Sequence, residues 1–179
     1  AGAERVFAIL DDPALKTERG GTLPLDEPFR ELTFRDVSLH YGDESTPALR
    51  GVSLTVKAGE RIAFVGPSGA GKTTLVNLIP RFYDPQRGEI LLNGKPLKEY
   101  SLASLRRSVS MVSQDAFLFD MTIAENIAYG RDLSSELDMD RVRSAAVAAY
   151  ADGFIRELPE GYETPIGERG VRLSGGQKQ

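Results

Sequence analysis

Residues 66–73 read Gly66-Pro67-Ser68-Gly69-Ala70-Gly71-Lys72-Thr73 and match the pattern G-x-x-x-x-G-K-[ST] at every fixed position. Glycines in such a loop let successive backbone N–H groups curl around phosphate oxygens, because no Cβ obstructs the approach. Lys72 would then place its charge at the β- and γ-phosphates, and the Thr73 hydroxyl would ligate Mg²⁺. The stretch therefore predicts a phosphate-binding loop, or P-loop, for a nucleoside triphosphate.

The segments on either side of this loop fit a strand before it and a helix after it. Residues 61–65 form a short apolar run that is typical of a buried parallel strand. Downstream, apolar side chains recur with helical spacing at Leu75, Val76, Leu78 and Ile79. The loop is therefore expected to end at a helix N-terminus, whose dipole favours anions.

The overall composition is that of a globular domain. The chain has 179 residues, and 41% of them are hydrophobic. Its formal net charge of −4 is not the excess of positive charge that indicates nucleic-acid binding. No apolar run approaches the ~18 to 20 residues of a membrane span, and the first residues do not resemble a signal peptide. The chain has no cysteine and only one histidine, His40, which excludes disulfides, thiolate metal sites and a histidine metal cluster.

The first half of the chain carries β-strand patterns. Residues 32–41 and 49–56 are β-rich with partial alternation and are separated by turn-forming residues at 42–47, which predicts an antiparallel subdomain. A further strand is expected at 89–92, followed by a turn at Asn93-Gly94.

The second half is mainly helical in pattern. A short helix is expected near residues 101–107, then an apolar strand at 109–112, then helices at about 122–129 and 137–150. The basic pair Arg106-Arg107 is interpreted as a solvated helix end.

The N-terminus is expected to be a helix that leads into a linker. Four apolar residues fall on one face of this short helix: Ala3, Val6, Phe7 and Leu10. Residues 11–28 are polar and rich in proline and glycine. We therefore expect a helix and linker over residues 1–28 and a domain over 29–179, with a helical subdomain at about 101–170.

A second motif lies close to the end of the chain, where residues 173–177 read Leu173-Ser174-Gly175-Gly176-Gln177. The motif places a hydroxyl and unhindered backbone donors at the start of a helix, an arrangement suited to a γ-phosphate.

The P-loop, Gln114 after an apolar segment, and residues 173–177, in that order, resemble the nucleotide-binding domain of ABC transporters. The similarity extends from about residue 4 to 179. Five segments resemble the exporter branch of that family: 81–85, 101–106, 112–115, 122–127 and 164–170. Within this branch the chain is most similar to the bacterial lipid A exporters, a family of homodimeric lipid flippases.

The resemblance implies the fold. It is an α/β P-loop NTPase core, mostly a parallel sheet with flanking helices, together with an N-terminal antiparallel β-subdomain and a helical subdomain. The family's Mg²⁺-binding Asp, general-base Glu and switch His follow the signature helix and do not occur in residues 1–179. We therefore expect the C-terminal part of the core to lie outside this sequence, and this chain alone to hydrolyse ATP negligibly. By the same resemblance, residues 1–28 would be an elbow helix and linker that follow a transmembrane domain not included in this sequence, and residues 29–179 a partial ATP-binding domain.

The resemblance also implies roles for individual residues. Tyr41 would stack on adenine, because every nucleobase offers a π face to an aromatic ring. Gln114 would touch Mg²⁺ or the attacking water, and Ser174 would reach the ATP bound to a second copy in a head-to-tail dimer. Glu168 and Arg169 would contact the coupling helices of the membrane domain.

The implied site is a set of residues from four segments. Lys72, Gln114 and Ser174 are the implied catalytic residues, and Thr73 and Gln114 are the implied metal ligands. The implied ATP contacts are Tyr41, Gly66, Pro67, Ser68, Gly69, Ala70, Gly71, Lys72, Thr73, Thr74, Gln114, Ser174, Gly175, Gly176 and Gln177.

The implied function is an ATP- and Mg²⁺-dependent motor at the cytoplasmic face of the bacterial inner membrane. It would power translocation of a lipid such as lipid A or of another amphipathic substrate. One alternative is a soluble ABC-type ATPase of DNA repair or translation, against which the exporter segments at 122–127 and 164–170 argue. The other is a nucleotide-binding regulatory module that does not hydrolyse ATP.

Overall fold

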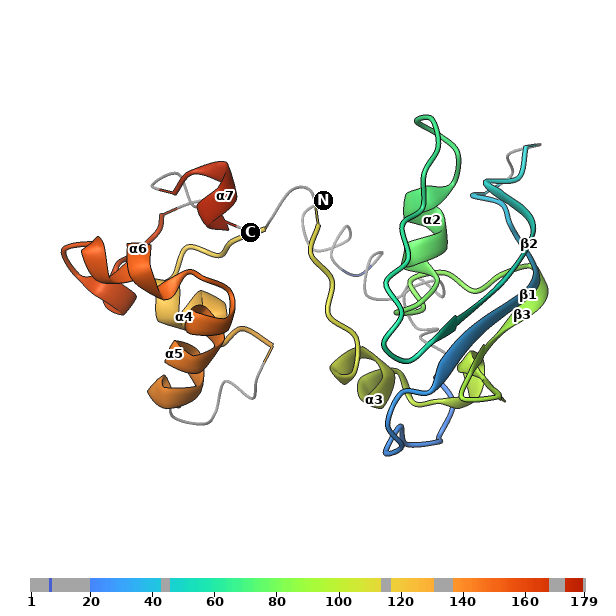
Figure 1. Ribbon diagram of the computed structural model, residues 1–179, viewed down its shortest axis with the longest axis horizontal. Helices are drawn as coiled ribbons and strands as arrows, with labels where there is room; N and C mark the ends of the chain where they lie inside the picture. The colour runs from blue at the N-terminus through green and yellow to red at the C-terminus, as the bar shows by residue number, and fades with distance from the viewer. Residues whose placement is uncertain are drawn as a thin grey trace. The chain divides into compact units, whose positions relative to one another are not determined.

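The computed structural model describes residues 7, 20–42, 46–113, 117–130, 137–167 and 173–178. The chain divides into two compact units, Ala1–Ser110 and Met111–Gln179 (Figure 1). Of the expected N-terminal helix, only Phe7 is described; it is helical and exposed. The boundary at residue 28 and the helical subdomain at 101–170 remain predictions.

The first unit is built on a four-stranded sheet with the order β2-β1-β3-β4. The long strand β1 (Glu31–Leu39) pairs antiparallel with β2 (Leu49–Lys57) on one side and with β3 (Arg87–Leu92) on the other (Figure 1). The expected antiparallel subdomain is confirmed.

A β-bulge explains why β1 alternates only in part. Leu32 and Phe34 are buried before the bulge, and Val37 and Leu39 are buried after it, so the inward-facing positions change from even to odd. The change occurs at Asp36, whose φ is +48° and where the register with β2 shifts. One extra residue in a strand moves all later side chains to the opposite face, so the bulge keeps both apolar pairs in the core.

The hairpin between β3 and β4 (Lys95–Pro96) has the expected two-residue turn. Asn93 and Gly94 have φ values of +52° and +82°, and Leu92 pairs with Lys95 across the turn. Positive φ at both central residues defines the type I′ turn that Asn-Gly favours. The short 3-10 helix η1 (Leu97–Glu99) follows directly.

Two α-helices contribute apolar side chains to the core of the sheet. α2 (Lys72–Asn77) starts at the P-loop, and α3 (Leu102–Arg107) starts at Ser101, whose hydroxyl accepts a hydrogen bond from the Ser104 N–H at 3.2 Å. The core consists of Leu32, Phe34, Val37, Leu39, Leu49, Leu75, Leu78, Ile90, Leu92, Leu97, Tyr100 and Leu105.

Two apolar segments that were expected as strands are not strands in the structure. Residues 61–65 and 109–112 have no strand assignment, and Val65 and Val112 are 93% and 79% exposed. A parallel strand is stable only between neighbours that satisfy its backbone groups and cover both of its faces. Among the described residues neither segment has a ladder partner, so the apolar pattern alone does not form a strand here.

The second unit is helical, as the pattern predicted. It contains α4 (Ile123–Ile127), α5 (Met139–Ala148), α6 (Asp152–Glu157), the 3-10 helix η2 (Gly161–Glu163) and α7 (Gly175–Lys178). Its core cluster is formed by the buried residues Ile123, Ala146, Ile155 and Ile166. Within the described part of the chain, no helix is both long enough and apolar enough to span a membrane.

Two polar contacts fix this helical unit. At the start of α4, the Glu125 N–H lies 3.2 Å from the Thr122 hydroxyl oxygen. The Glu125 carboxylate accepts from the Thr122 N–H at 2.8 Å and from the Thr122 hydroxyl at 3.0 Å, and these two bonds to the carboxylate lower the pKa of Glu125. Between α6 and η2, the Tyr162 hydroxyl donates to Asp152 at 2.7 Å, which lowers the pKa of that carboxyl.

Helix α5 ends in a motif that normally selects glycine. The Ala151 N–H donates to the Ala146 carbonyl at 2.8 Å, and the Tyr150 N–H donates to the Val147 carbonyl at 3.1 Å, which is the Schellman pattern. Tyr150 occupies the left-handed position with φ +57° and is 95% exposed. A bulky residue with this φ is an outlier, because its Cβ crowds the following carbonyl oxygen.

We expect Tyr150→Asn to raise the free energy of unfolding by about 1 kcal/mol, because asparagine tolerates the left-handed conformation that tyrosine does not. Denaturant unfolding of the two proteins measures the difference. Tyr150→Phe is the control, since it keeps the strain and should leave stability unchanged. A gain for Phe equal to that for Asn would show that strain is not the cause.

Candidate functional site

The P-loop is fixed against the start of β2 by a glycine that no other residue could replace without movement. Gly71 caps α2 in the left-handed conformation, with φ +82°. A Cβ at this position would lie 2.5 Å from the backbone oxygen of Ala48 and 2.8 Å from the Leu49 side chain. The close approach of the two segments thus depends on the missing side chain.

The Lys72 ammonium lies inside the curl of this loop. Its Nζ donates to the carbonyl oxygens of Gly66 and Pro67, both at 2.7 Å. An ammonium group has three donors and no acceptor, so it can turn from these carbonyls to phosphate oxygens at the same place. Thr73, the next residue, is exposed and also lines the cavity described below.

A cavity of about 430 Å³ opens over the P-loop. Its lining residues are Tyr41, Thr46, Pro47, Ala48, Ser68, Gly69, Ala70, Gly71, Lys72, Thr73 and Thr74. Tyr41 follows β1, and its hydroxyl donates to the Thr74 Oγ1 at 3.0 Å. The structure therefore brings Tyr41 to the P-loop, while its role towards a base stays a prediction.

The motif at residues 173–177 begins helix α7 in the second unit. The Ser174 N–H donates to Gln177 Oε1 at 2.9 Å, and the Gln177 N–H lies 3.4 Å from the Ser174 hydroxyl. This reciprocal pair explains locally why a serine is followed by a glutamine at the third position. Gly175 and Gly176 are exposed, with open space where a Cβ would be. The role of these residues towards a phosphate stays a prediction.

The segment before residue 168 is held at the start of α4. Thr122 and Pro165 form an antiparallel bridge, and the Ile166 N–H donates to the Met121 carbonyl at 3.2 Å. Ile166 is 1% exposed. Three residues assigned by resemblance, Gln114, Glu168 and Arg169, lie outside the described residues.

Arg106 is not a solvated helix end, as its sequence context suggested. Its Nε donates to the Pro80 carbonyl at 3.2 Å, its Nη2 donates to the Arg81 carbonyl at 3.4 Å, and its guanidinium carbon lies 5.8 Å from the centre of the Phe82 ring. The side chain therefore holds the turn that follows α2. The charge of Arg106 in the sequence could not predict these contacts, because the carbonyls lie 25 or 26 residues earlier in the chain.

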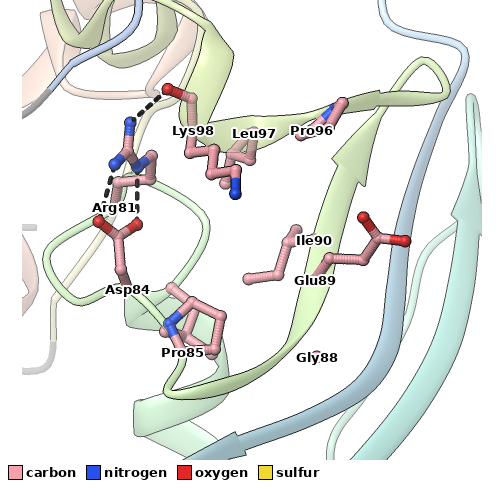
Figure 2. A pocket seen from close by; sticks show the side chains of 10 residues that line it. Arg81, Asp84, Pro85, Gly88, Glu89, Ile90, Pro96, Leu97 and Lys98 are labelled. Carbon is pink, nitrogen blue, oxygen red and sulfur yellow. Dashed lines mark hydrogen bonds and ion pairs between the residues drawn. The ribbon is translucent and has the colours of Figure 1, made fainter.

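Arg81 fixes the same turn from inside. Its side chain is 5% exposed, and its guanidinium donates to both carboxylate oxygens of Asp84 at 2.8 and 2.7 Å and to the Lys98 carbonyl at 3.2 Å (Figure 2). Two parallel bonds to one carboxylate fix the geometry as well as the charge. Its φ of +55° places the turn in the left-handed region.

The first unit joins an antiparallel sheet to a P-loop, with Tyr41 lining the cavity over that loop. The second unit is helical and contains the helix that begins at the Ser-Gly-Gly-Gln motif. These features together define a class of nucleotide-binding domains. The sequence profile of the family described as "ABC transporter" matches residues 49–179. The chain belongs to the ABC transporter family.

The curated relatives are similar over nearly the whole chain. A protein of Cupriavidus metallidurans named "ATP-dependent lipid A-core flippase" is 50% identical over 177 residues, which is 99% of this chain and 30% of that protein. A protein of the same name from Hahella chejuensis is 48% identical over 179 residues, again 30% of that protein. "ABC transporter B family member 29, chloroplastic" of Arabidopsis thaliana is 48% identical over 98% of this chain.

A solved structure supports the same fold. "Structure of a bacterial Atm1-family ABC exporter with ATP bound" superposes with a TM-score of 0.84 at 42% identity and covers 98% of this chain. The chain spans about 30% of the length of these relatives. The α/β fold of an ABC ATPase, with its antiparallel N-terminal sheet, is thus confirmed.

Proposed function

We propose that this chain is part of the ATP-binding and hydrolysing motor domain of an exporter that moves a lipid such as lipid A across the bacterial inner membrane. The observation that carries the proposal is the site itself: the Lys72 ammonium inside the P-loop and Tyr41 lining the same cavity. Relatives named ATP-dependent lipid A-core flippases, about half identical to this chain, support the substrate class.

The residues of the cavity fit a magnesium nucleotide. We assign the base to Tyr41 and the phosphates to the amides of residues 68–71, with Lys72 between the β- and γ-phosphates. The exposed Thr73 hydroxyl, together with Gln114, would hold Mg²⁺. When bound, the ion neutralises phosphate charge during in-line attack by water. Ser174 of a second copy would approach the γ-phosphate in a head-to-tail dimer.

We assign the contact with the membrane domain to an aromatic cluster in the helical unit that sequence analysis did not single out. The rings of Phe119 and Tyr129 stack with centroids 4.0 Å apart, and Phe117 packs edge-to-face on Phe119 at 5.0 Å. Phe117 and Tyr129 are 72% and 52% exposed. Exposed, contiguous aromatic residues are typical of protein interfaces. The coupling helices of the membrane domain are the proposed partner, with Glu168 and Arg169 as further contacts.

The proposal is tested by reconstituting the whole protein into vesicles that contain a fluorescent lipid A derivative. ATP with Mg²⁺ should drive lipid A from one leaflet to the other, and added lipid A should stimulate ATP hydrolysis. A non-hydrolysable ATP analogue is the control and should support neither. Stimulation by DNA or ribosomes in place of lipid would favour the soluble ATPase. ATP binding with no turnover under any condition would favour the regulatory module.

A further inference from the structure

A second tyrosine lies behind Tyr41. The rings of Tyr41 and Tyr83 meet edge-to-face, with centroids 5.0 Å apart and an interplanar angle of 82°. Tyr83 does not line the cavity over the P-loop, whereas Tyr41 does. Edge-to-face packing is a preferred geometry for two aromatic rings, so the contact restricts the orientation of the Tyr41 ring.

Tyr83 belongs to a turn that is held firmly from two directions. Arg106 of α3 donates to the carbonyls of Pro80 and Arg81, and its guanidinium lies over the Phe82 ring. On the other side of Tyr83, the Asp84 carboxylate is held by the buried Arg81 guanidinium (Figure 2). Tyr83 is therefore presented by a turn with fixed ends, although its own side chain is 45% exposed.

The chain after the turn is tied to the end of β1, next to Tyr41. The Gln86 N–H donates to the Ser38 carbonyl at 3.1 Å. The Gln86 side chain accepts from the His40 N–H at 2.9 Å and donates to the His40 carbonyl at 3.0 Å. These bonds keep the backbones that carry Tyr41 and Tyr83 in register. The contact between the two rings thus joins two segments that are already aligned.

Tyr41 is fixed at its other end by the P-loop helix. Its hydroxyl donates to Thr74 Oγ1, and Thr74 is 8% exposed in the first turn of α2. A ring held at its hydroxyl and braced by a second aromatic has lost most of its rotational freedom before a ligand arrives. Preorganisation of this kind raises affinity, because less entropy is lost on binding.

We propose that Tyr83 is a positioning residue for the nucleobase: it braces the Tyr41 ring in the orientation that stacks on the base and touches neither the base nor the phosphates. The proposal rests on the proposed function, since it requires Tyr41 to be the base platform. It assigns Tyr83 to recognition of the base alone.

The test compares a ligand that has a base with one that lacks it. In the whole protein, Tyr83→Leu is expected to raise the Kd for ATP roughly two- to tenfold, the range of an aromatic pair. The Kd for inorganic triphosphate, measured with the same Mg²⁺ concentration, should not change. Tyr83→Phe keeps the ring and should retain the wild-type Kd for both ligands. In a Tyr41→Ala background, Tyr83→Leu should cause no further loss of ATP affinity.

Three results would overturn the role of Tyr83 and leave the proposed function standing. They are an unchanged ATP affinity in Tyr83→Leu, an equal loss of affinity for ATP and for inorganic triphosphate, and a loss of ATP affinity on Tyr83→Leu that is as large in the Tyr41→Ala background as in the wild type. A different result separates the two proposals. If Tyr41→Ala binds ATP as the wild type does, the base platform is wrong, and the role of Tyr83 fails with it. Because Tyr83 is half exposed, the thermal unfolding midpoints of Tyr83→Leu and Tyr83→Phe should stay close to that of the wild type.

Discussion

Lys72→Ala is expected to lower the ATP turnover of the whole protein by at least about a hundredfold, the scale of losing one preorganised charge at a reacting group. Nζ lies inside the loop, 2.7 Å from two carbonyl oxygens, and supplies the positive charge that the β- and γ-phosphates require. Alanine leaves the backbone amides in place but removes this charge. Steady-state hydrolysis at saturating ATP measures the effect.

Lys98→Ala is the matched control for this change. Lys98 is an exposed lysine of the same unit, and its backbone carbonyl accepts a hydrogen bond from Arg81. Its side chain should be dispensable, so turnover should stay at the wild-type rate. Wild-type turnover in Lys72→Ala would remove Lys72 from its assigned role, and an equal loss in Lys98→Ala would point to a general effect of surface charge.

Gly71→Ala is expected to destabilise the chain by roughly 2–4 kcal/mol and to abolish nucleotide binding with it. The left-handed φ of +82° costs alanine about 1–2 kcal/mol, and the new Cβ would also meet the Ala48 carbonyl oxygen at 2.5 Å. Either the P-loop or the start of β2 must move. Denaturant unfolding and nucleotide titration of the same variant measure both effects.

Gly59→Ala separates strain from collision. Gly59 has nearly the same φ, +81°, in a turn outside the P-loop, and a Cβ there meets nothing within 4 Å. Gly59→Ala should therefore lower the free energy of unfolding only by the cost of the left-handed backbone, and it should leave the affinity for nucleotide unchanged. Equal destabilisation in the two variants would mean that the contact with Ala48 does not constrain the loop.

The sequence predicts best the features that depend on neighbouring residues. Asn93-Gly94 specifies its own turn because both residues accept positive φ. Thr122 and Ser101 cap helices through side chains only a few residues from the backbone groups they satisfy. The helices at 102–107, 123–127 and 139–148 follow from these signals together with apolar spacing.

Features that depend on distant residues could not be found in this way. The apolar run at 61–65 has the composition of a strand but lacks a described partner, and a strand needs one. Arg106 looked like surface charge because the carbonyls it binds follow another helix. No sequence pattern around Tyr150 indicates a left-handed cap, because tyrosine is an unusual residue at that position.

The candidate site was predictable in its parts but not in its assembly. Residues 66–73 predict a phosphate-binding site through their own glycines and lysine. That Tyr41 lies over this loop followed only from family resemblance, since nothing in a lone strand tyrosine points to a P-loop. Tyr83 behind it was not predicted at all, because the contact depends on how the turn after α2 folds back to β1.

In the proposed function, the amides of the P-loop and the Lys72 ammonium bind a nucleoside triphosphate. Titration calorimetry of the protein with ATP in the presence of Mg²⁺ tests it most directly. We predict a saturable binding isotherm for the wild type that weakens strongly in Lys72→Ala and is unaltered in Lys98→Ala. An absence of any binding isotherm for ATP with the folded wild-type protein would show that the P-loop does not bind the nucleotide.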